Sequence, residues 1–171
     1  FHYFWNMKIN IRPIQPSDNA ILAKIIRSCF HDFEVKCTAG TVYTDPTTDD
    51  LYSLFQTPKS QLWVAEADDK IVGCCGIFPT ENLPEGCTEL VKFYISNEGR
   101  GKGIGRLLLE KTIETAQEFG YSQIYLESIP EFSTAVSIYE KQGFQYLNQP
   151  LGNTGHDGCN LWMLKEMSNE Q

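Results

Sequence analysis

The stretch Arg100-Gly101-Lys102-Gly103-Ile104-Gly105 decides how the rest of the chain is interpreted. It follows an apolar run at residues 90–95 and leads into a helical pattern at 106–119. A strand, a glycine-rich turn and a helix N-terminus together form an anion site, because the first helical N–H groups lack partners within the helix. Glycine lets a phosphate approach the backbone, and Arg100, Lys102 and Arg106 add positive charge. The stretch therefore predicts a phosphate-binding turn.

The spacing of the glycines distinguishes between phosphate motifs. The dinucleotide fingerprint requires glycine at its first, third and sixth positions, and the sixth position counted from Gly101 is Arg106. The P-loop requires Gly-Lys-Ser/Thr at its end, and the turn has no such end. Arg-x-x-Gly-x-Gly instead resembles the pyrophosphate loop of the GNAT superfamily of N-acetyltransferases. An ordinary strand-to-helix turn has the same appearance, so other parts of the chain must support the resemblance.

The length of 171 residues predicts one domain at 8–167, after a leader at 1–7 whose role is open. The net charge of −8 argues against general nucleic-acid binding and suits a cationic amine. No apolar run approaches the roughly 20 residues that cross a bilayer, so we expect no membrane segment. The six cysteines match no zinc or disulfide pattern, which predicts free thiols in a reducing cytoplasm.

Apolar periodicity predicts the order of the secondary-structure elements. We expect strands at residues 8–12, 61–67, 70–78, 88–96, 123–128, 144–147 and 160–164. We expect helices at residues 17–30, from 47 over a short length, at 106–119 and at 132–142. Ser17 and Thr47 are the predicted N-caps, and Asp68-Asp69 is a predicted hairpin turn. Gly73 and Gly76 inside a strand indicate a bulge or a close backbone approach.

Two further motifs resemble the same family. They are Gly120-Tyr-Ser-Gln-Ile-Tyr-Leu-Glu127, after the loop helix, and Ala135-Val-Ser-Ile-Tyr-Glu-Lys-Gln-Gly-Phe144. The second resembles the family signature Ala-x-x-Leu-Tyr-x-x-x-Gly-Phe. The resemblance, which covers about residues 8–166, implies an α/β (α+β) GNAT fold. That fold has a mixed, mostly antiparallel sheet of six to seven strands, about four helices and a splayed acyl-CoA cleft.

The chain departs from the family pattern at Phe132, where many members carry an asparagine that contacts the cofactor. An aromatic side chain there would pack on the pantetheine arm instead. Glu89-Leu-Val-Lys-Phe-Tyr94 is similar to a bacterial branch that reads Glu-Leu-x-Lys-x-Tyr in the fourth strand.

The resemblance implies acetyl-CoA as co-substrate. It places the backbone of residues 100–106 on the pyrophosphate, which includes Arg100, Gly101, Lys102, Gly103, Ile104, Gly105 and Arg106. The strand edge at Phe93, Tyr94 and Ile95 would pair with pantetheine amides.

The resemblance places Tyr139 beside the thioester sulfur, where it would protonate the departing thiolate. The alternative for Tyr139 is a core aromatic. Glu89 would take the proton of the acceptor amine, and the alternative is a solvated carboxylate. Glu127 and His156 are weaker candidates for substrate contact, since Glu127 also fits a surface position and His156 an exposed loop. We expect no metal.

The resemblance implies an N-acetyltransferase, and we expect it to move an acetyl group directly from acetyl-CoA to a primary amine. The acceptor would be a small molecule or a peptide, and the enzyme a monomer or a homodimer. A non-catalytic acyl-CoA sensor would share the loop without needing Tyr139 or an accessible base. An open groove would favour a protein acceptor, and a pocket closed by residues 31–46 a small molecule.

Overall fold

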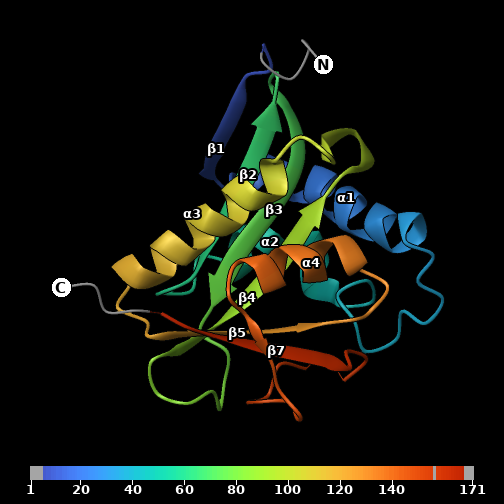
Figure 1. Ribbon diagram of the computed structural model, residues 1–171. Coiled ribbons are helices and arrows are strands. Elements are labelled where there is room, and N and C mark those ends of the chain that lie inside the picture. Colours follow the sequence, from blue (N-terminus) through green and yellow to red (C-terminus); the bar gives the residue numbers. More distant parts are fainter. Residues whose placement is uncertain (1–5, 156, 168–171) are drawn as a thin grey trace.

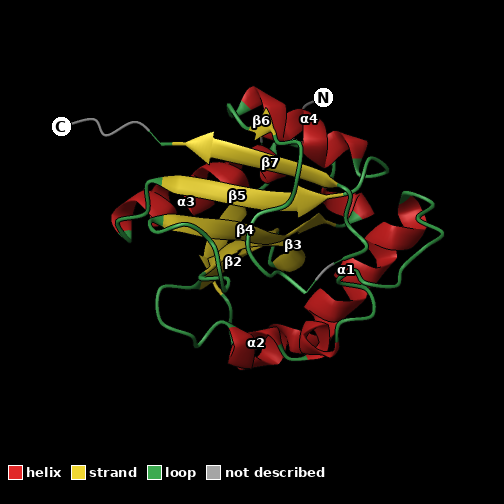
Figure 2. Ribbon diagram, turned by 90° about the horizontal axis from the view of Figure 1, so that it is seen from below, coloured by secondary structure: helices red, strands yellow, loops and turns green. Residues whose placement is uncertain are grey.

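The computed structural model describes residues 6–155 and 157–167, and a single mixed sheet runs through it (Figures 1 and 2). The strands lie in the order β1-β2-β3-β4-β5-β7-β6. Their bounds are Ile9–Pro13 (β1), Gln61–Ala67 (β2), Lys70–Phe78 (β3), Cys87–Ile95 (β4), Gln123–Ser128 (β5), Gln145–Tyr146 (β6) and Leu161–Glu166 (β7). The α-helices are Asn19–Asp32 (α1), Leu51–Leu54 (α2), Ile104–Glu118 (α3) and Ser133–Lys141 (α4). The described part of the chain thus confirms the predicted seven-stranded GNAT arrangement.

The first four strands form an antiparallel meander, as predicted. Asp68 and Asp69 turn the β2–β3 hairpin with φ of 49° and 65°, the left-handed values that a tight hairpin needs. Gly76 allows β2 and β3 to approach closely, since a Cβ there would lie 2.4 Å from the Gln61 carbonyl oxygen. Gly73 borders a bulge in β3, where the register with β2 shifts between Ala65 and Glu66. Both parts of the prediction for this strand, the bulge and the close approach, are confirmed.

The β4–β5 pair interrupts the regular sheet. These strands are parallel, and they pair only over Cys87–Glu89 and Gln123–Tyr125. Beyond Glu89 the strands diverge, as Figure 1 shows, and β5 continues as the antiparallel partner of β7. In the same part of β4, Lys92 has a φ of 57°, so the strand bulges toward its partner β3 with a residue in a left-handed conformation. The splayed cleft expected from the resemblance is therefore present.

The helices cover the two faces of the sheet (Figure 2). One apolar cluster joins α3 and α4 to one face and includes Leu108, Leu109 and Phe144. The other cluster joins α1 and α2 to the opposite face and includes Leu22, Ile26 and Leu51. The adjacent cysteines of β3 divide between them: Cys75 lies in the first cluster and Cys74 in the second.

Two predicted helix starts were wrong. Ser17 lies inside a 3₁₀ turn, Pro16–Asp18, rather than at an N-cap. Asp18 is nearly buried, accepts the Gln15 N–H and two Arg12 bonds, and so fixes that turn. Thr47 lies inside a second 3₁₀ turn, Pro46–Asp49, which Asp45 caps instead. Proline at the first position of each turn explains the shift, because its fixed φ favours that position.

The connection between α1 and the second 3₁₀ turn contains neither helix nor strand over 34–45. None of the helices in the described residues is both long and apolar enough to span a membrane.

Candidate active site

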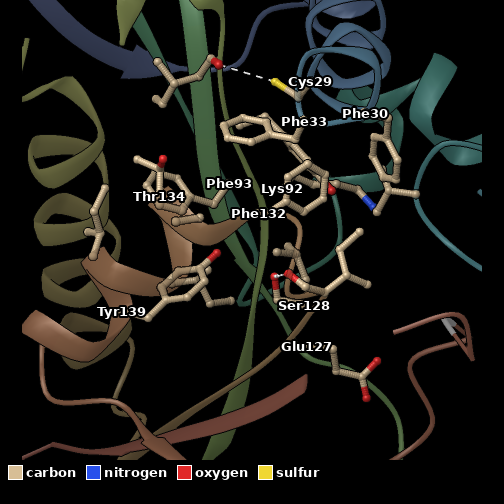
Figure 3. Close-up of a pocket in the computed structure, with 18 of the residues that line it drawn as sticks. Cys29, Phe30, Phe33, Lys92, Phe93, Glu127, Ser128, Phe132, Thr134 and Tyr139 are labelled. Carbon is tan, nitrogen blue, oxygen red and sulfur yellow. Dashed lines mark hydrogen bonds between the residues drawn. The ribbon is translucent and has the colours of Figure 1, made fainter. Parts of the chain in front are cut away.

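A pocket opens where β4 and β5 separate (Figure 3). Its walls come from α1, the segment that follows α1, β4, β5 and α4. Figure 3 shows Cys29 and Phe33 at one end of the pocket and Glu127 at the other. The predicted residues that line it are Glu89, Phe93, Tyr94, Ile95, Arg100, Gly101, Glu127, Phe132 and Tyr139. Residues from six separate stretches of the sequence therefore meet in one cavity.

The glycine turn has the geometry of an anion site. Gly101 and Gly103 have φ of 73° and 77°, which side chains rarely adopt, and a Cβ at either position would meet no atom within 4 Å. Gly103 is the N-cap of α3, and its carbonyl accepts the first helical bond, from Leu107 N–H at 3.2 Å. The three amides before Leu107 have no carbonyl partner in the described residues. The N-terminus of α3 therefore has backbone amides available for a ligand and open space next to Gly101 and Gly103 for that ligand to occupy.

Gly105 has a different reason to be glycine. A Cβ there would lie 3.3 Å from both Ile138 and Phe93, so its absence lets α3 pack closely on β4 and α4. The three glycines of the turn therefore meet two different requirements: a left-handed backbone at Gly101 and Gly103, and close packing at Gly105.

The basic side chains around the turn are already engaged within the chain. The guanidinium of Arg100 donates to Asp32 at 2.9 Å and to the Ile95 carbonyl at 3.0 Å, and it stacks 4.6 Å from the Phe33 ring. Lys102 donates to the Glu98 carbonyl at 2.6 Å. Arg100 therefore ties the turn to the end of α1, and backbone amides carry more of the predicted anion site than the sequence suggested.

Arg106 lies on the outer surface of α3, with 68% of its side chain exposed, 3.6 Å from Glu110. Its guanidinium lies near the turn but is exposed to solvent, so a salt bridge that it makes with a ligand contributes little binding energy.

Tyr139 projects from α4 into the pocket (Figure 3). Its ring is 5% exposed and packs against Phe93 and Phe144, each with a centroid distance of 5.7 Å. Burial raises the pKa of Tyr139 well above the ordinary value for a phenol. Its hydroxyl is therefore protonated at any working pH and points toward the pocket centre, where it can donate a proton or a hydrogen bond.

Glu89 lies at the last paired position of β4, opposite Tyr125. Its side chain is 5% exposed, so the alternative of a solvated carboxylate is wrong. One oxygen accepts the Thr80 hydroxyl at 2.6 Å. Burial, with a smaller effect from the charge of Glu127, raises the pKa of Glu89 from 4.5 to about 7 despite that hydrogen bond and nearby Lys92.

Glu127 lines the pocket in a half-buried position rather than facing open solvent as surface charge. One oxygen accepts the Tyr125 hydroxyl at 2.6 Å and the other accepts Thr154 at 2.5 Å. The Tyr125 oxygen also accepts the Leu151 N–H at 3.1 Å. These bonds hold the β6–β7 connection against β5 and fix the carboxylate beside the pocket. His156 lies outside the described residues.

Phe132 belongs to an aromatic wall rather than to open solvent. Its ring lies 5.1 Å from Phe30, 5.7 Å from Phe33 and 5.8 Å from Tyr94, all at steep angles. Edge-to-face contacts of this kind stabilise by about 0.5–1.5 kcal/mol each beyond area burial. The position at which the family resemblance implies an asparagine is thus part of an aromatic surface.

Sequence reasoning missed Lys92 and Cys159, which also line the pocket. Lys92 stands within the quoted strand motif, and simple alternation would have placed it on the opposite face from Glu89. The bulge in β4 removes that alternation. Burial lowers the pKa of Lys92 and raises that of Cys159 to about 12.

Two connections meet over the Glu127 end of the pocket. The Gly158 N–H donates to the Gly40 carbonyl at 3.0 Å. A Cβ at Gly158 would lie 2.4 Å from the Ala39 carbonyl oxygen, so the two backbones are in direct contact. Thr41 and Cys159, the next residues along each connection, line the pocket. The described residues of these connections therefore cover this end.

Among the described residues, no group of three or more His, Cys, Asp or Glu side chains is arranged to hold a metal ion. The six thiols are all free in this structure.

Fold and pocket together define an α/β enzyme with a ligand cleft between two diverging strands. A sequence model described as the acetyltransferase (GNAT) family matches residues 22–144. The uncharacterized N-acetyltransferase YjgM of Escherichia coli is 33% identical over 165 residues, which is 92% of this chain and 99% of that protein. The chain belongs to the acetyltransferase (GNAT) family, and its enzyme class is N-acetyltransferase.

Comparison with solved structures gives the same fold. A GNAT-family acetyltransferase from Staphylococcus aureus Mu50 has a TM-score of 0.81 at 24% identity, covering 94% of this chain and all of that one. A putative acetyltransferase, yncA of Salmonella typhimurium, solved with its cofactor acetyl-CoA, has a TM-score of 0.73 at 19% identity, with 95% of each chain covered. Membership of the bacterial branch with the Glu-Leu-x-Lys-x-Tyr strand stays a prediction.

The raised pKa of Glu89 predicts a pH-dependent cost to stability. A carboxyl whose pKa is higher in the folded protein contributes stability below its unfolded pKa of 4.5 and loses it as pH rises through about 7. The loss amounts to about 3 kcal/mol. Glu89→Gln cannot ionise, so we expect its unfolding free energy to rise by about that amount relative to wild type between pH 5 and pH 8. Urea unfolding at both pH values measures it.

Glu114→Gln is the control, because it removes an exposed carboxylate from α3. A difference between Glu89→Gln and wild type that stays constant with pH would show that Glu89 titrates normally.

Proposed function

We propose that the chain transfers an acetyl group from acetyl-CoA directly to the primary amine of a small molecule, with Glu89 as the base. The observation that carries the proposal is the buried Glu89 carboxyl, whose pKa is raised to about 7 at the point where the cleft begins. A base with a pKa near neutral is half ionised at working pH and can accept the ammonium proton.

The cofactor assignment rests on the glycine turn and the open edge of β4. The turn offers free amides and space for a pyrophosphate, which helix N-termini bind well. After Glu89 no β5 residue pairs with β4, so Phe93, Tyr94 and Ile95 border the gap where pantetheine amides would lie. The Salmonella structure, which contains acetyl-CoA, has the same fold and supports this placement.

The reaction needs three proton transfers. Glu89 accepts a proton from the acceptor ammonium, and the amine nitrogen then attacks the thioester carbonyl carbon. The carbon–sulfur bond breaks, and the thiolate takes a proton from Tyr139, whose hydroxyl is protonated because burial raises its pKa. The second proton that the attacking nitrogen loses, on becoming an amide, returns Tyr139 to its protonated form. Direct transfer requires no acyl-enzyme. The high pKa of Cys159, about 12, makes its thiol a poor nucleophile and supports that simpler path.

The covered end of the pocket favours a small acceptor over a folded protein. The Gly40–Gly158 contact joins the two connections there, and further bonds fix the β6–β7 side, including Asn153 N–H to the Glu81 carbonyl at 2.9 Å. A folded protein surface would need these connections to separate.

We also propose that residues 8–167 form one catalytic domain, and that the enzyme works in the cytoplasm as a monomer or a homodimer.

Activity is tested by acetyl-CoA consumption over a panel of amino acids, polyamines, aminoglycosides and peptides. Wild type should acetylate at least one small amine, with a pH–rate profile whose acidic limb reports a pKa of about 7. Glu89→Gln should lower kcat/KM by roughly 10²–10⁴-fold and abolish that limb. Tight acetyl-CoA binding without turnover of any amine would favour the non-catalytic sensor.

The glycine turn can be tested with two valine variants. Gly103 and Gly120 both have positive φ, 77° and 86°, and at neither would a Cβ meet an atom within 4 Å. Gly103→Val places its side chain in front of the helix N-terminus, while Gly120→Val places it at the opposite end of α3 with the same kind of backbone strain. We expect acetyl-CoA to raise the melting temperature of Gly120→Val but not of Gly103→Val. Equal shifts in both would place the pyrophosphate elsewhere.

Tyr139→Phe tests the proton donor. The substitution keeps the ring contacts with Phe93 and Phe144 and removes only the hydroxyl. We expect acetyl-CoA affinity by calorimetry to stay unchanged and kcat to fall roughly 10²–10⁴-fold, the range for a lost general acid. Full activity in this variant would leave Tyr139 with a packing role.

A further inference from the structure

Lys92 is a buried cation that the reaction described above does not use. Its side chain is 6% exposed, and it lines the pocket from the bulge of β4, where its φ is 57°. No hydrogen bond or ion pair joins its ammonium to another residue in the parts of the chain that the structure describes. Figure 3 shows it among the aromatic rings of the pocket. Among the described residues no fully buried side-chain nitrogen or oxygen lacks a hydrogen-bond partner, so the ammonium of Lys92 reaches the open space of the pocket. A largely buried cation that faces a pocket is stabilised by a counter-charge that meets it there.

The groups that face Lys92 show which part of the pocket it serves. They are Asp45 of the α1-side connection, Glu89 of β4, Cys74 of β3 and Cys159 of the β6–β7 connection. Asp45 already accepts the Thr47 N–H and hydroxyl at 2.9 and 2.8 Å, and Glu89 accepts Thr80. Lys92 therefore lies between β4 and the two connections that cover the pocket, in the part of the pocket that Figure 3 shows lined by Phe30 and Phe132.

The part of the pocket around Lys92 combines three chemical features. Glu89 and Glu127 provide carboxylates for an amine. Lys92 provides a cation that makes no hydrogen bond or ion pair with the described residues, and the rings of Phe30 and Phe132 provide an apolar wall. A ligand that satisfies all three carries an ammonium, a carboxylate and an apolar side chain.

We propose that Lys92 binds the carboxylate of the acceptor, so that the acceptor is a free amino acid with an apolar side chain. This inference rests on the proposed function, since it names the amine that the same site acetylates. Lys92 is a specificity residue: its ammonium pairs with the carboxylate and thereby orients the amine toward Glu89. An amide or a decarboxylated amine of the same shape leaves the buried cation without a partner.

The test uses matched triplets: L-phenylalanine, L-phenylalaninamide and 2-phenylethylamine, and L-leucine, L-leucinamide and 3-methylbutylamine. Acetyl-CoA consumption gives kcat/KM for each with wild type, Lys92→Met and the control Lys24→Met, which removes an exposed lysine of α1. We expect wild type to prefer the acids at least tenfold. Amino amides lose their ammonium proton more readily than amino acids, so such a preference reports binding and not amine reactivity.

Lys92→Met removes the cation that pairs with the acceptor carboxylate. We therefore expect it to lower kcat/KM for the acids roughly 30- to 1,000-fold, mainly by raising KM. The ratio of acid to amide should fall toward one, and Lys24→Met should keep the wild-type ratio. Thermal unfolding with and without acetyl-CoA checks that Lys92→Met folds. If Lys92→Met does not fold, the preference of wild type for acids over amides and amines tests the proposal by itself.

Three results separate the possible failures. Wild type that acetylates amides or amines as well as acids overturns the role of Lys92 and leaves the acetyltransferase proposal standing. An equal loss on all members of a triplet in Lys92→Met does the same, because it shows a structural role. If no amine, polyamines included, consumes acetyl-CoA, the proposed function fails and the acceptor inference fails with it.

Discussion

The structure depends on where backbone pairing between β4 and β5 stops. The two strands share only three paired positions, Cys87–Glu89 with Gln123–Tyr125, and β5 then continues with β7 as its partner. Unpaired backbone groups are costly in a buried sheet, so a divergence of this kind persists only where other groups or a ligand meet them. The open edge of β4, the glycine turn that follows it and the helix α4 all border the same gap. One interruption in the sheet thus creates the cofactor cleft.

The same interruption sets the chemistry of Glu89. At the last paired position, the strands are still close enough to exclude water from its side chain, which raises its pKa to about 7. One residue further along, the gap is open to a ligand. The boundary between paired and unpaired strand is where burial and access coincide.

Most of the fold could be predicted from the sequence because its signals are local. The Asp68-Asp69 turn, the strand glycines and the helical spacing of α3 each depend on neighbours in the chain. The site was harder to predict from the sequence, because its properties depend on contacts between segments that are distant in the chain. The bond from Arg100 to Asp32 spans 68 positions, and the side-chain direction of Lys92 depends on a bulge relative to β3. A charged residue in a strand motif looks solvent-facing until the register is known.

Glu89 and Lys92 lie in one pocket with opposite charges, and no ion pair joins them. A direct bond would lower the pKa of Glu89 toward its ordinary value and leave it a weaker base. It would also occupy the ammonium of Lys92. The hydrogen bond from Thr80 holds one oxygen of Glu89, and the left-handed turn at Lys92 directs that side chain separately. Keeping the two charges apart leaves a carboxyl with a near-neutral pKa and a cation that can meet a ligand carboxylate, which is the pair of groups that the proposed acceptor, an amino acid, would require.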